Sequence, residues 1–373
     1  MTIPYVQSSA SQEVPPPYYF PGVNVTAFVW EAQIDRVSAY CDRFFNLGTT
    51  RERGFVYKPA PAWPYATLLF MDYPMMISTA QQSIAPEPEY SERGYVKQTE
   101  VFVAFPVVRY GATPANLVFG STIEWAIPFI VVGNPMSAVC GREMVGLPKL
   151  LADIKIGDGD FPGSFEASVR LPGWPTREGA QAEEPFLVVK TAPSLPTYRG
   201  RPPASSIWSL FQSREAGWGF DEIANASNTL NRVTVGLAPS EMRTVSLKQI
   251  RDAVHPERAL YQALVTCLSR YSNVREFSFY NERDVHIEFT TAGSFRSILE
   301  LFRDLPPGPA NPIHAVKPKA AYRFTADIDF GDMRTIHTFP VDRGPGLPPV
   351  RASSDLAAPW ARPWLGLFRG ERG

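Results

Sequence analysis

Residues 140–156 read CGREMVGLPKLLADIKI, and the expected fold is organised around this stretch. Lys149 directly follows Pro148, in a turn between two apolar runs, residues 129–132 (FIVV) and 150–152 (LLA). Such runs are typical of buried strands. Because burial disfavours the charged form of an amine, the sequence predicts a lysine that is neutral near pH 7. A neutral lysine is a nucleophile that can form a Schiff base with a ketone.

The residues around Lys149 also form a motif. Residues 141–149 read GREMVGLPK, which fits the pattern G-R-E-x-x-G/A-x-P-K followed by a short apolar strand. This pattern resembles the acetoacetate decarboxylase family and its wider superfamily, in which the lysine of the motif forms the Schiff base. The resemblance implies that Lys149 is the catalytic amine. The simpler alternative is a turn lysine with its amine in solvent, as most lysines are.

Two carboxylates lie on strands expected upstream of the motif. Glu100 precedes the apolar run 101–107 (VFVAFPV), and the family resembles this in having a strand glutamate followed by a proline-valine pair. A carboxylate on an apolar strand suits proton transfer or ion pairing with the lysine, and the alternative is an exposed strand face. Asp72 lies in the apolar segment 66–78, where the family has a carboxylate facing the site. Its alternative is a strand-end acid beside Pro74.

We expect Asp72, Arg142 and Glu143 to take part in substrate binding, the last two because they belong to the matched motif. Two departures from the family bear on the substrate. The decarboxylases carry a second lysine after the reactive one, where this chain has Leu150. The family's early arginine, which holds the substrate carboxylate, has no match in residues 22–26 (GVNVT). A larger or differently charged ketone than acetoacetate is therefore expected.

The resemblance implies Schiff-base lyase chemistry on a keto acid or related carbonyl compound. Loss of carbon dioxide from an imine gives an enamine, and the same imine serves aldol addition and dehydration in some relatives. Two alternatives stay open: a true β-keto acid decarboxylase, and a non-catalytic small-molecule binding protein on the same scaffold. The family also implies a homo-oligomer.

Composition and motif content argue against several classes of partner and cofactor. The chain has 373 residues and a formal net charge of −1, and it shows no long basic or acidic run, which argues against nucleic acid or an anionic membrane as a partner. The four histidines lack metal-ligand spacing, and no phosphate-loop or dinucleotide motif is present, so we expect no metal and no cofactor. Three widely spaced cysteines and the lack of a signal sequence predict a soluble, cytoplasmic protein.

Most expected elements are short strands with a few helices, so we predict a single α+β domain. Its centre is a large antiparallel sheet, closed like a barrel, with a few peripheral helices. The expected organisation is a proline-rich arm over residues 1–20, the domain over 21–345 with insertions near 172–231, and a Trp/Pro-rich tail over 346–373.

Several local predictions test this organisation. Apolar positions at helical spacing predict a helix over residues 34–45, a short helix over 247–254 and another over 294–302. The run 129–140 is broken by a Gly-Asn-Pro turn and is interpreted as two core strands.

Overall fold

The computed structural model describes ten segments of the chain. They are residues 14–60, 65–80, 94–111, 122–157, 164–169, 187–191, 198–200, 241–280, 285–290 and 313–340. The expected insertions at 172–231, the helix at 294–302 and the tail at 346–373 fall wholly or largely outside these segments. Of the expected N-terminal arm only residues 14–20 are described, and the first strand already begins at Tyr18.

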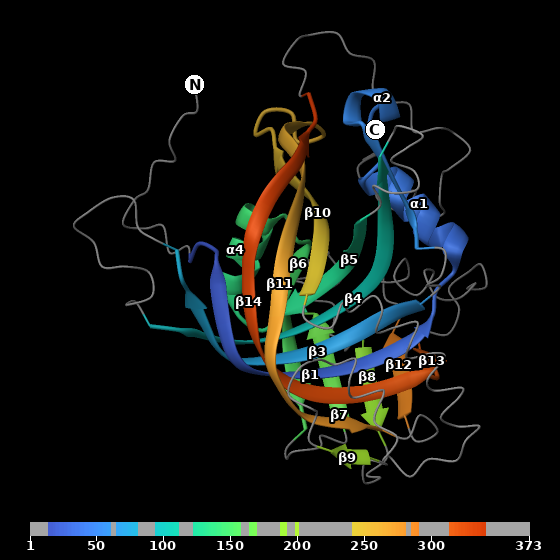
Figure 1. Ribbon diagram of the computed structural model, residues 1–373, viewed down its shortest axis with the longest axis vertical. Coiled ribbons are helices and arrows are strands. Elements are labelled where there is room, and N and C mark those ends of the chain that lie inside the picture. The colour runs from blue at the N-terminus through green and yellow to red at the C-terminus, as the bar shows by residue number, and fades with distance from the viewer. Residues whose placement is uncertain are drawn as a thin grey trace, which may run out of the picture.

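Seven strands close into a barrel of mixed direction, and further strands lie outside it (Figure 1). In their order around the barrel the seven are β1 (Tyr18–Glu31), β3 (Tyr65–Ser78), β4 (Val96–Gly111), β5 (Thr122–Val132), β10 (Glu241–Arg251), β11 (Ala259–Phe279) and β14 (Ala320–Thr338). Pairing of β14 with β1 closes the ring. The predicted closed, barrel-like sheet with few helices is confirmed.

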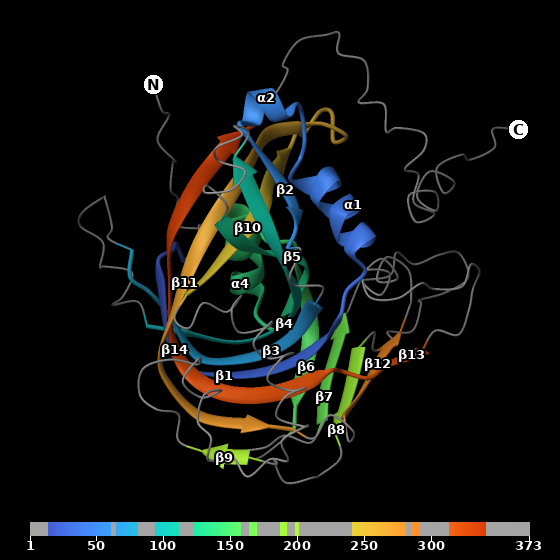
Figure 2. The same cartoon turned by 45° about the vertical axis from the view of Figure 1, so that its right-hand side comes forward.

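A second group of strands extends from the barrel (Figure 2). It contains β6 (Lys149–Ile156), β7 (Ser164–Val169), β8 (Leu187–Thr191), β12 (Val285–Thr290) and β13 (Ile313–Val316). We call these five strands the flanking sheet. It is joined to the barrel because β6 pairs in parallel with β5, and β5 also pairs in parallel with β10. These two pairings depart from the antiparallel sheet that the sequence predicted. Two short strands, β2 (Phe55–Pro59) and β9 (Tyr198–Gly200), pair with β4 and β11.

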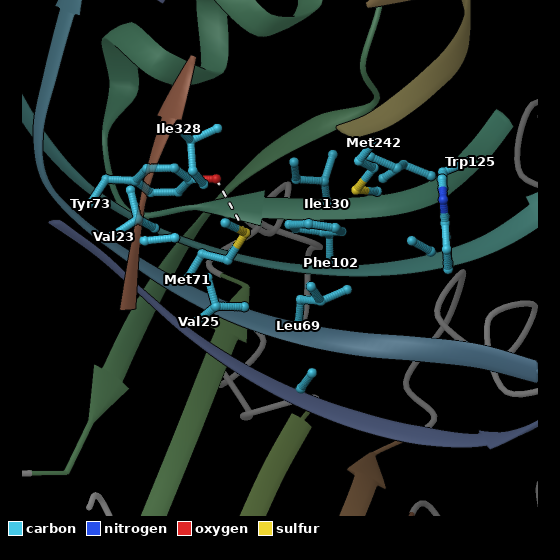
Figure 3. Close-up of a cluster of buried hydrophobic side chains, with 14 of the residues drawn as sticks. Val23, Val25, Leu69, Met71, Tyr73, Phe102, Trp125, Ile130, Met242 and Ile328 are labelled. Atoms are coloured by element: carbon cyan, nitrogen blue, oxygen red, sulfur yellow. Dashed lines mark hydrogen bonds between the residues drawn. The ribbon is translucent and has the colours of Figure 1, made fainter. Parts of the chain in front are cut away.

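Alternation along the barrel strands separates two cores, because successive residues of a strand point to opposite faces of a sheet. On β3, Leu69 and Met71 belong to the inner core, whereas Leu68 and Phe70 belong to the outer core. Figure 3 shows the inner cluster, to which several barrel strands contribute. The outer core is closed by the flanking sheet, whose Phe165 contacts Phe70 at 4.9 Å between ring centres.

The helices take two different positions. Helix α1 (Ile34–Phe44) confirms the amphipathic pattern, since its Val37 and Cys41 are buried in the outer core. Helix α2 (Thr50–Arg53) is a single turn that begins with a capping box at Thr49. Helix α4 (Pro135–Cys140) is followed directly by the π-helical turn η2 (Gly141–Val145). Whereas α1 packs on the outer core, α4 and η2 contribute Ala138 and Val145 to the inner core.

Two local predictions were wrong. The second of the two strands expected in residues 129–140 is instead helix α4, because the side chain of Asn134 accepts hydrogen bonds from the first turn and Pro135 is tolerated there. The helix expected over residues 247–254 is the end of β10 and the turn after it. The apolar residues that suggested that helix, Ile250 and Val254, are exposed.

Candidate active site

The turn before Lys149 is shaped by α4 and η2. Asn134 Oδ1 accepts hydrogen bonds from the backbone N–H groups of Met136 (2.9 Å) and Ser137 (3.4 Å), and this fixes the start of α4. The turn ends at Gly146, which has a left-handed backbone with φ of 77°. A Cβ at Gly146 would also approach Lys248 Cα to 2.7 Å, so two independent constraints favour glycine at this position.

The other glycine of the motif makes room for the lysine itself. A Cβ at Gly141 would lie 2.4 Å from Lys149 Cδ and 2.6 Å from Cε. The side chain of Lys149 therefore passes directly over the backbone of Gly141. Lys149 opens β6 opposite Ile130 of β5, not in a turn as the sequence suggested. The strand pairing with β5 fixes where its side chain starts.

The amine of Lys149 is buried among polar partners. It forms an ion pair with Glu100 Oε1 on β4, and it donates a hydrogen bond to Ser137 Oγ at 2.9 Å. Lys149 is 7% exposed and Glu100 5% exposed. A buried charge is costly unless it is paired. Lys149 and Glu100 therefore compensate each other's burial. The structure thus brings together Lys149 and Glu100, and the solvent-facing alternatives for both do not hold.

The second oxygen of Glu100 is also occupied. Tyr73 on β3 donates its hydroxyl proton to Glu100 Oε2 at 3.1 Å, and Gln98 Nε2 lies 3.4 Å from Oε1. Burial, and next the negative charge of Glu100, raise the pKa of Tyr73 well above its usual value. The tyrosine therefore stays a hydrogen-bond donor, which holds the carboxylate in a single orientation.

A cavity of about 70 Å³ adjoins the amine inside the barrel. Its described lining is mainly apolar, with many aromatic and methionine side chains, and Glu100, Gln98 and Ser137 lie near Lys149. The apolar members include Phe20, Met71, Met76, Phe102, Met242 and Phe330. Burial raises the pKa of Tyr271, another lining residue, so its hydroxyl also stays protonated. Figure 3 shows Met71, Phe102 and Met242 in the inner cluster together with Tyr73.

The chain near the N-terminus closes one side of this cavity. Tyr18 and Phe20, at the start of β1, are among the lining residues. Tyr18 donates its hydroxyl proton to the carbonyl of Val14 at 2.6 Å, and Ser78 Oγ donates to the carbonyl of Pro15 at 2.6 Å. Tyr18 and Phe20, which fall in the expected N-terminal arm, therefore form part of the wall of the site.

The remaining predicted residues lie elsewhere. The placement of Asp72 facing the lysine was wrong: it neighbours Tyr73 on the same strand, and because Tyr73 points inward, Asp72 points outward into a different cavity. Arg142 and Glu143 are exposed on η2 and do not line the cavity beside Lys149. The expected substrate-binding role of these three residues finds no support in their positions.

Sequence reasoning missed Tyr73, Gln98 and Ser137. Gln98 lies two residues before Glu100, and strand alternation alone would have placed both on one face. Ser137 could have been found from the helix-start signal at Asn134, which puts it in the first turn of a helix. Tyr73 was obscured by the neighbouring carboxylate, which drew the interpretation to the wrong face of β3.

Other functional features can be assessed in the described segments. They contain no cluster of three or more His, Cys, Asp or Glu side chains with the geometry of a metal site. None of the helices in them is both long and apolar enough to cross a membrane. The cysteines Cys41, Cys140 and Cys267 are all buried and form no disulfide bond.

The fold has known relatives among solved structures. No family model and no curated protein sequence matches the chain. The fold is similar to that of acetoacetate decarboxylase from Legionella pneumophila, with 12% identity, a TM-score of 0.50, and coverage of 91% of this chain and 93% of that one. A second acetoacetate decarboxylase structure matches with 12% identity, a TM-score of 0.46, and coverage of 90% and 96%.

A third similar structure is the enduracididine biosynthesis enzyme MppR in complex with pyruvate. It has 13% identity, a TM-score of 0.48, and coverage of 88% of this chain and 93% of that one. The chain therefore has an acetoacetate decarboxylase-like fold, as the motif around Lys149 predicted. At this level of identity the likeness defines the fold and leaves the reaction to be argued from the site.

Proposed function

We propose that the protein is a lyase in which the amine of Lys149 forms a Schiff base with the carbonyl group of a small substrate. The observation that carries this proposal is the buried amine of Lys149, held by Glu100 and Ser137 at the wall of a mainly apolar cavity. Such surroundings exclude water and favour imine chemistry. The likeness to an acetoacetate decarboxylase adds a scaffold on which such chemistry is known.

The site residues have defined roles in this proposal. Glu100 accepts a proton from the Lys149 amine, and the freed nitrogen attacks the carbonyl carbon. The carbinolamine takes back a proton and loses water, which gives an iminium ion. In cleavage of a β-hydroxy ketone, Glu100 takes the proton of the β-hydroxyl group, the carbon–carbon bond breaks, and the far fragment leaves as an aldehyde or ketone. The iminium accepts the electron pair of the broken bond and becomes an enamine. Protonation at carbon and addition of water then release the product and free Lys149.

The charges in the cavity favour an uncharged substrate. Among the described residues that line it, Lys149 carries the one positive group, and that group is used in the imine. Residues 22–26, which have no match to the family's early arginine, contribute Val23 and Val25 to the inner hydrophobic core. The carboxylate of a keto acid would lie beside Glu100 without a cationic partner, which is costly in a buried site. We therefore favour cleavage or formation of a carbon–carbon bond to an uncharged ketone or aldehyde over decarboxylation.

Reductive trapping with a matched pair of compounds tests this. The protein is incubated with sodium cyanoborohydride and either 2-pentanone or 2-oxopentanoate, which share a five-carbon chain and differ in the carboxylate. Intact mass then measures the adduct. We expect an adduct with the ketone to form about tenfold faster or more, because the keto acid would bury an unpaired charge.

The outcomes separate the hypotheses. No adduct with either compound contradicts the Schiff-base mechanism and favours a non-catalytic binding protein. A faster reaction with 2-oxopentanoate retains the mechanism and overturns the charge argument. In that case release of carbon dioxide from a β-keto acid would identify a decarboxylase.

A further inference from the structure

A second cavity, of about 380 Å³, lies on the outer side of the barrel. It is bounded by the barrel strands β1, β3, β4 and β14 and by β6 and β7 of the flanking sheet. Its described polar lining residues are Asn24, Thr26, Asp72, Lys97, Thr99 and Arg323. None of these residues lines the cavity beside Lys149, so the two spaces lie on opposite faces of the same wall.

The polar side chains form a row across neighbouring strands. Asn24 on β1 pairs with Thr325 of β14 on one side and with Asp72 of β3 on the other, and Asp72 pairs with Thr99 of β4. Polar groups between two packed sheets are costly unless they find partners. Most of this outer face is apolar, and the flanking sheet covers part of it. A row of this kind, beside an open cavity, therefore indicates a binding surface.

The floor of the cavity combines a cation with aromatic rings. Arg323 is 8% exposed, and its Nη2 donates to Asn24 Oδ1 at 3.4 Å. Thr325 Oγ1 lies 2.9 Å from Asn24 Oδ1 and 2.9 Å from Glu276 Oε2, so its single proton is shared between the amide and this neighbouring carboxylate. The apolar part of the lining consists of the half-buried Ile156 and of Phe70 and Phe165, both 1% exposed. A guanidinium recognises carboxylates with a planar fork of donors, and the amide and hydroxyl groups of Asn24 and Thr26 can hydrogen-bond to hydroxyl groups.

The remaining charges lie toward the solvent. Lys97 is exposed and Asp72 is half-buried. With Arg323 they give the lining two positive groups and one negative group. We infer that this cavity binds a polyhydroxylated carboxylate, such as a sugar acid. Its carboxylate contacts Arg323, its hydroxyls contact Asn24, Thr26 and Asp72, and Lys97 at the entrance attracts the anion.

Calorimetric titration of the full chain with gluconate tests this inference. Sorbitol has the hydroxyls without the carboxylate, and hexanoate has the carboxylate without the hydroxyls. We expect gluconate to bind and each control compound to bind about tenfold more weakly or worse, because each lacks one of the two recognised groups. Equal binding of hexanoate and gluconate, or no binding of gluconate, overturns the inference.

Substitutions inside and outside the second cavity test where gluconate binds. Arg323→Lys keeps the charge and loses the fork, and we expect it to weaken gluconate binding about tenfold or more. Lys97→Gln, at an exposed position that leaves the fold intact, should weaken it about threefold. Lys155→Gln removes an exposed lysine of β6 that does not line the cavity, and it should leave the affinity unchanged.

Lys149→Ala should also retain gluconate binding, which separates this site from the imine chemistry. Loss of binding in Lys149→Ala, or an affinity that survives both Arg323→Lys and Lys97→Gln, would contradict the assignment. If Arg323→Lys does not fold, Lys97→Gln decides the question, since an unchanged affinity in that variant counts against the site.

Discussion

Two buried carboxylates on neighbouring barrel strands have the same kinds of partner and different surroundings. Glu100 on β4 contacts Lys149 and Tyr73 at the wall of the inner cavity. Glu124 on β5 contacts Arg109 and another tyrosine, and it does not line that cavity. A carboxylate, a cation and a phenol occur in both places, so these three groups alone do not define a reactive site. The features found only around Lys149 are the ones that bear on the chemistry.

The Glu124 cluster has a structural role. Glu124 is fully buried, its Oε1 lies 3.1 Å from Arg109 Nη2, and its Oε2 accepts a hydrogen bond from Tyr57. Burial raises the pKa of Glu124, and Arg109 and Tyr57 oppose that rise. A guanidinium stays protonated in proteins and cannot act as a nucleophile. The Lys149 cluster differs in having a cation that can lose its proton and an adjoining space for a substrate.

The largest predicted effect is on the rate of reductive trapping. Replacing Glu100 should lower this rate strongly, whereas replacing Glu124 should not. Glu100→Gln keeps the shape of the side chain and loses its basicity, so the rate of reductive trapping with 2-pentanone should fall roughly 10²–10⁴-fold. Glu124→Gln is the matched control and should trap within about twofold of the original rate. Equal losses in the two variants would remove the distinction between the clusters.

Substitution of the two glycines of the motif should separate an effect on the reaction from an effect on stability. Gly141→Ala places a methyl group against the flexible end of Lys149, so the protein should fold while trapping slows about tenfold or more. Gly146→Ala meets the backbone of Lys248 at a left-handed position, and it should lower the free energy of unfolding by about 2 kcal/mol or more. Trapping rates and denaturant titrations of both variants measure this. A Gly141→Ala variant that traps at the original rate would contradict the position assigned to Lys149.

The smallest effect concerns pH. Because the pKa of Glu124 is raised in the folded protein, its folded form binds a proton more readily than its unfolded form. The resulting stability is present below the ordinary glutamate pKa of 4.5 and is lost as pH rises through the raised value. The free energy of unfolding of the original protein should therefore fall relative to that of Glu124→Gln as pH rises above 4.5. Denaturant titrations across this range test it, and a difference that does not change with pH would contradict the burial argument.

The sequence predicted the parts of the molecule that depend on local pattern. The motif around Lys149 indicated both the fold and the candidate amine, because Gly141 and Gly146 are required by contacts that few other residues allow. The apolar strand around Glu100 indicated a buried carboxylate, and the amphipathic pattern of α1 was confirmed.

The missed features depend on which face of a strand meets which neighbour. Asp72 and Tyr73 are adjacent, and the sequence contains no signal for which of them points into the barrel. At the end of β10, Leu247, Ile250 and Val254 have a helix-like spacing, yet pairing with β11 holds the segment through Arg251 as a strand. Tertiary pairing overrides local propensity in such segments.

The central claim is that the amine of Lys149 is the nucleophile of the barrel. Peptide mapping of the protein after trapping with 2-pentanone and cyanoborohydride tests it most directly. We predict that the adduct lies on the peptide containing Lys149 and that Lys149→Ala forms none at a comparable rate. An adduct spread over exposed lysines such as Lys155, with Lys149 unmodified, would contradict the account.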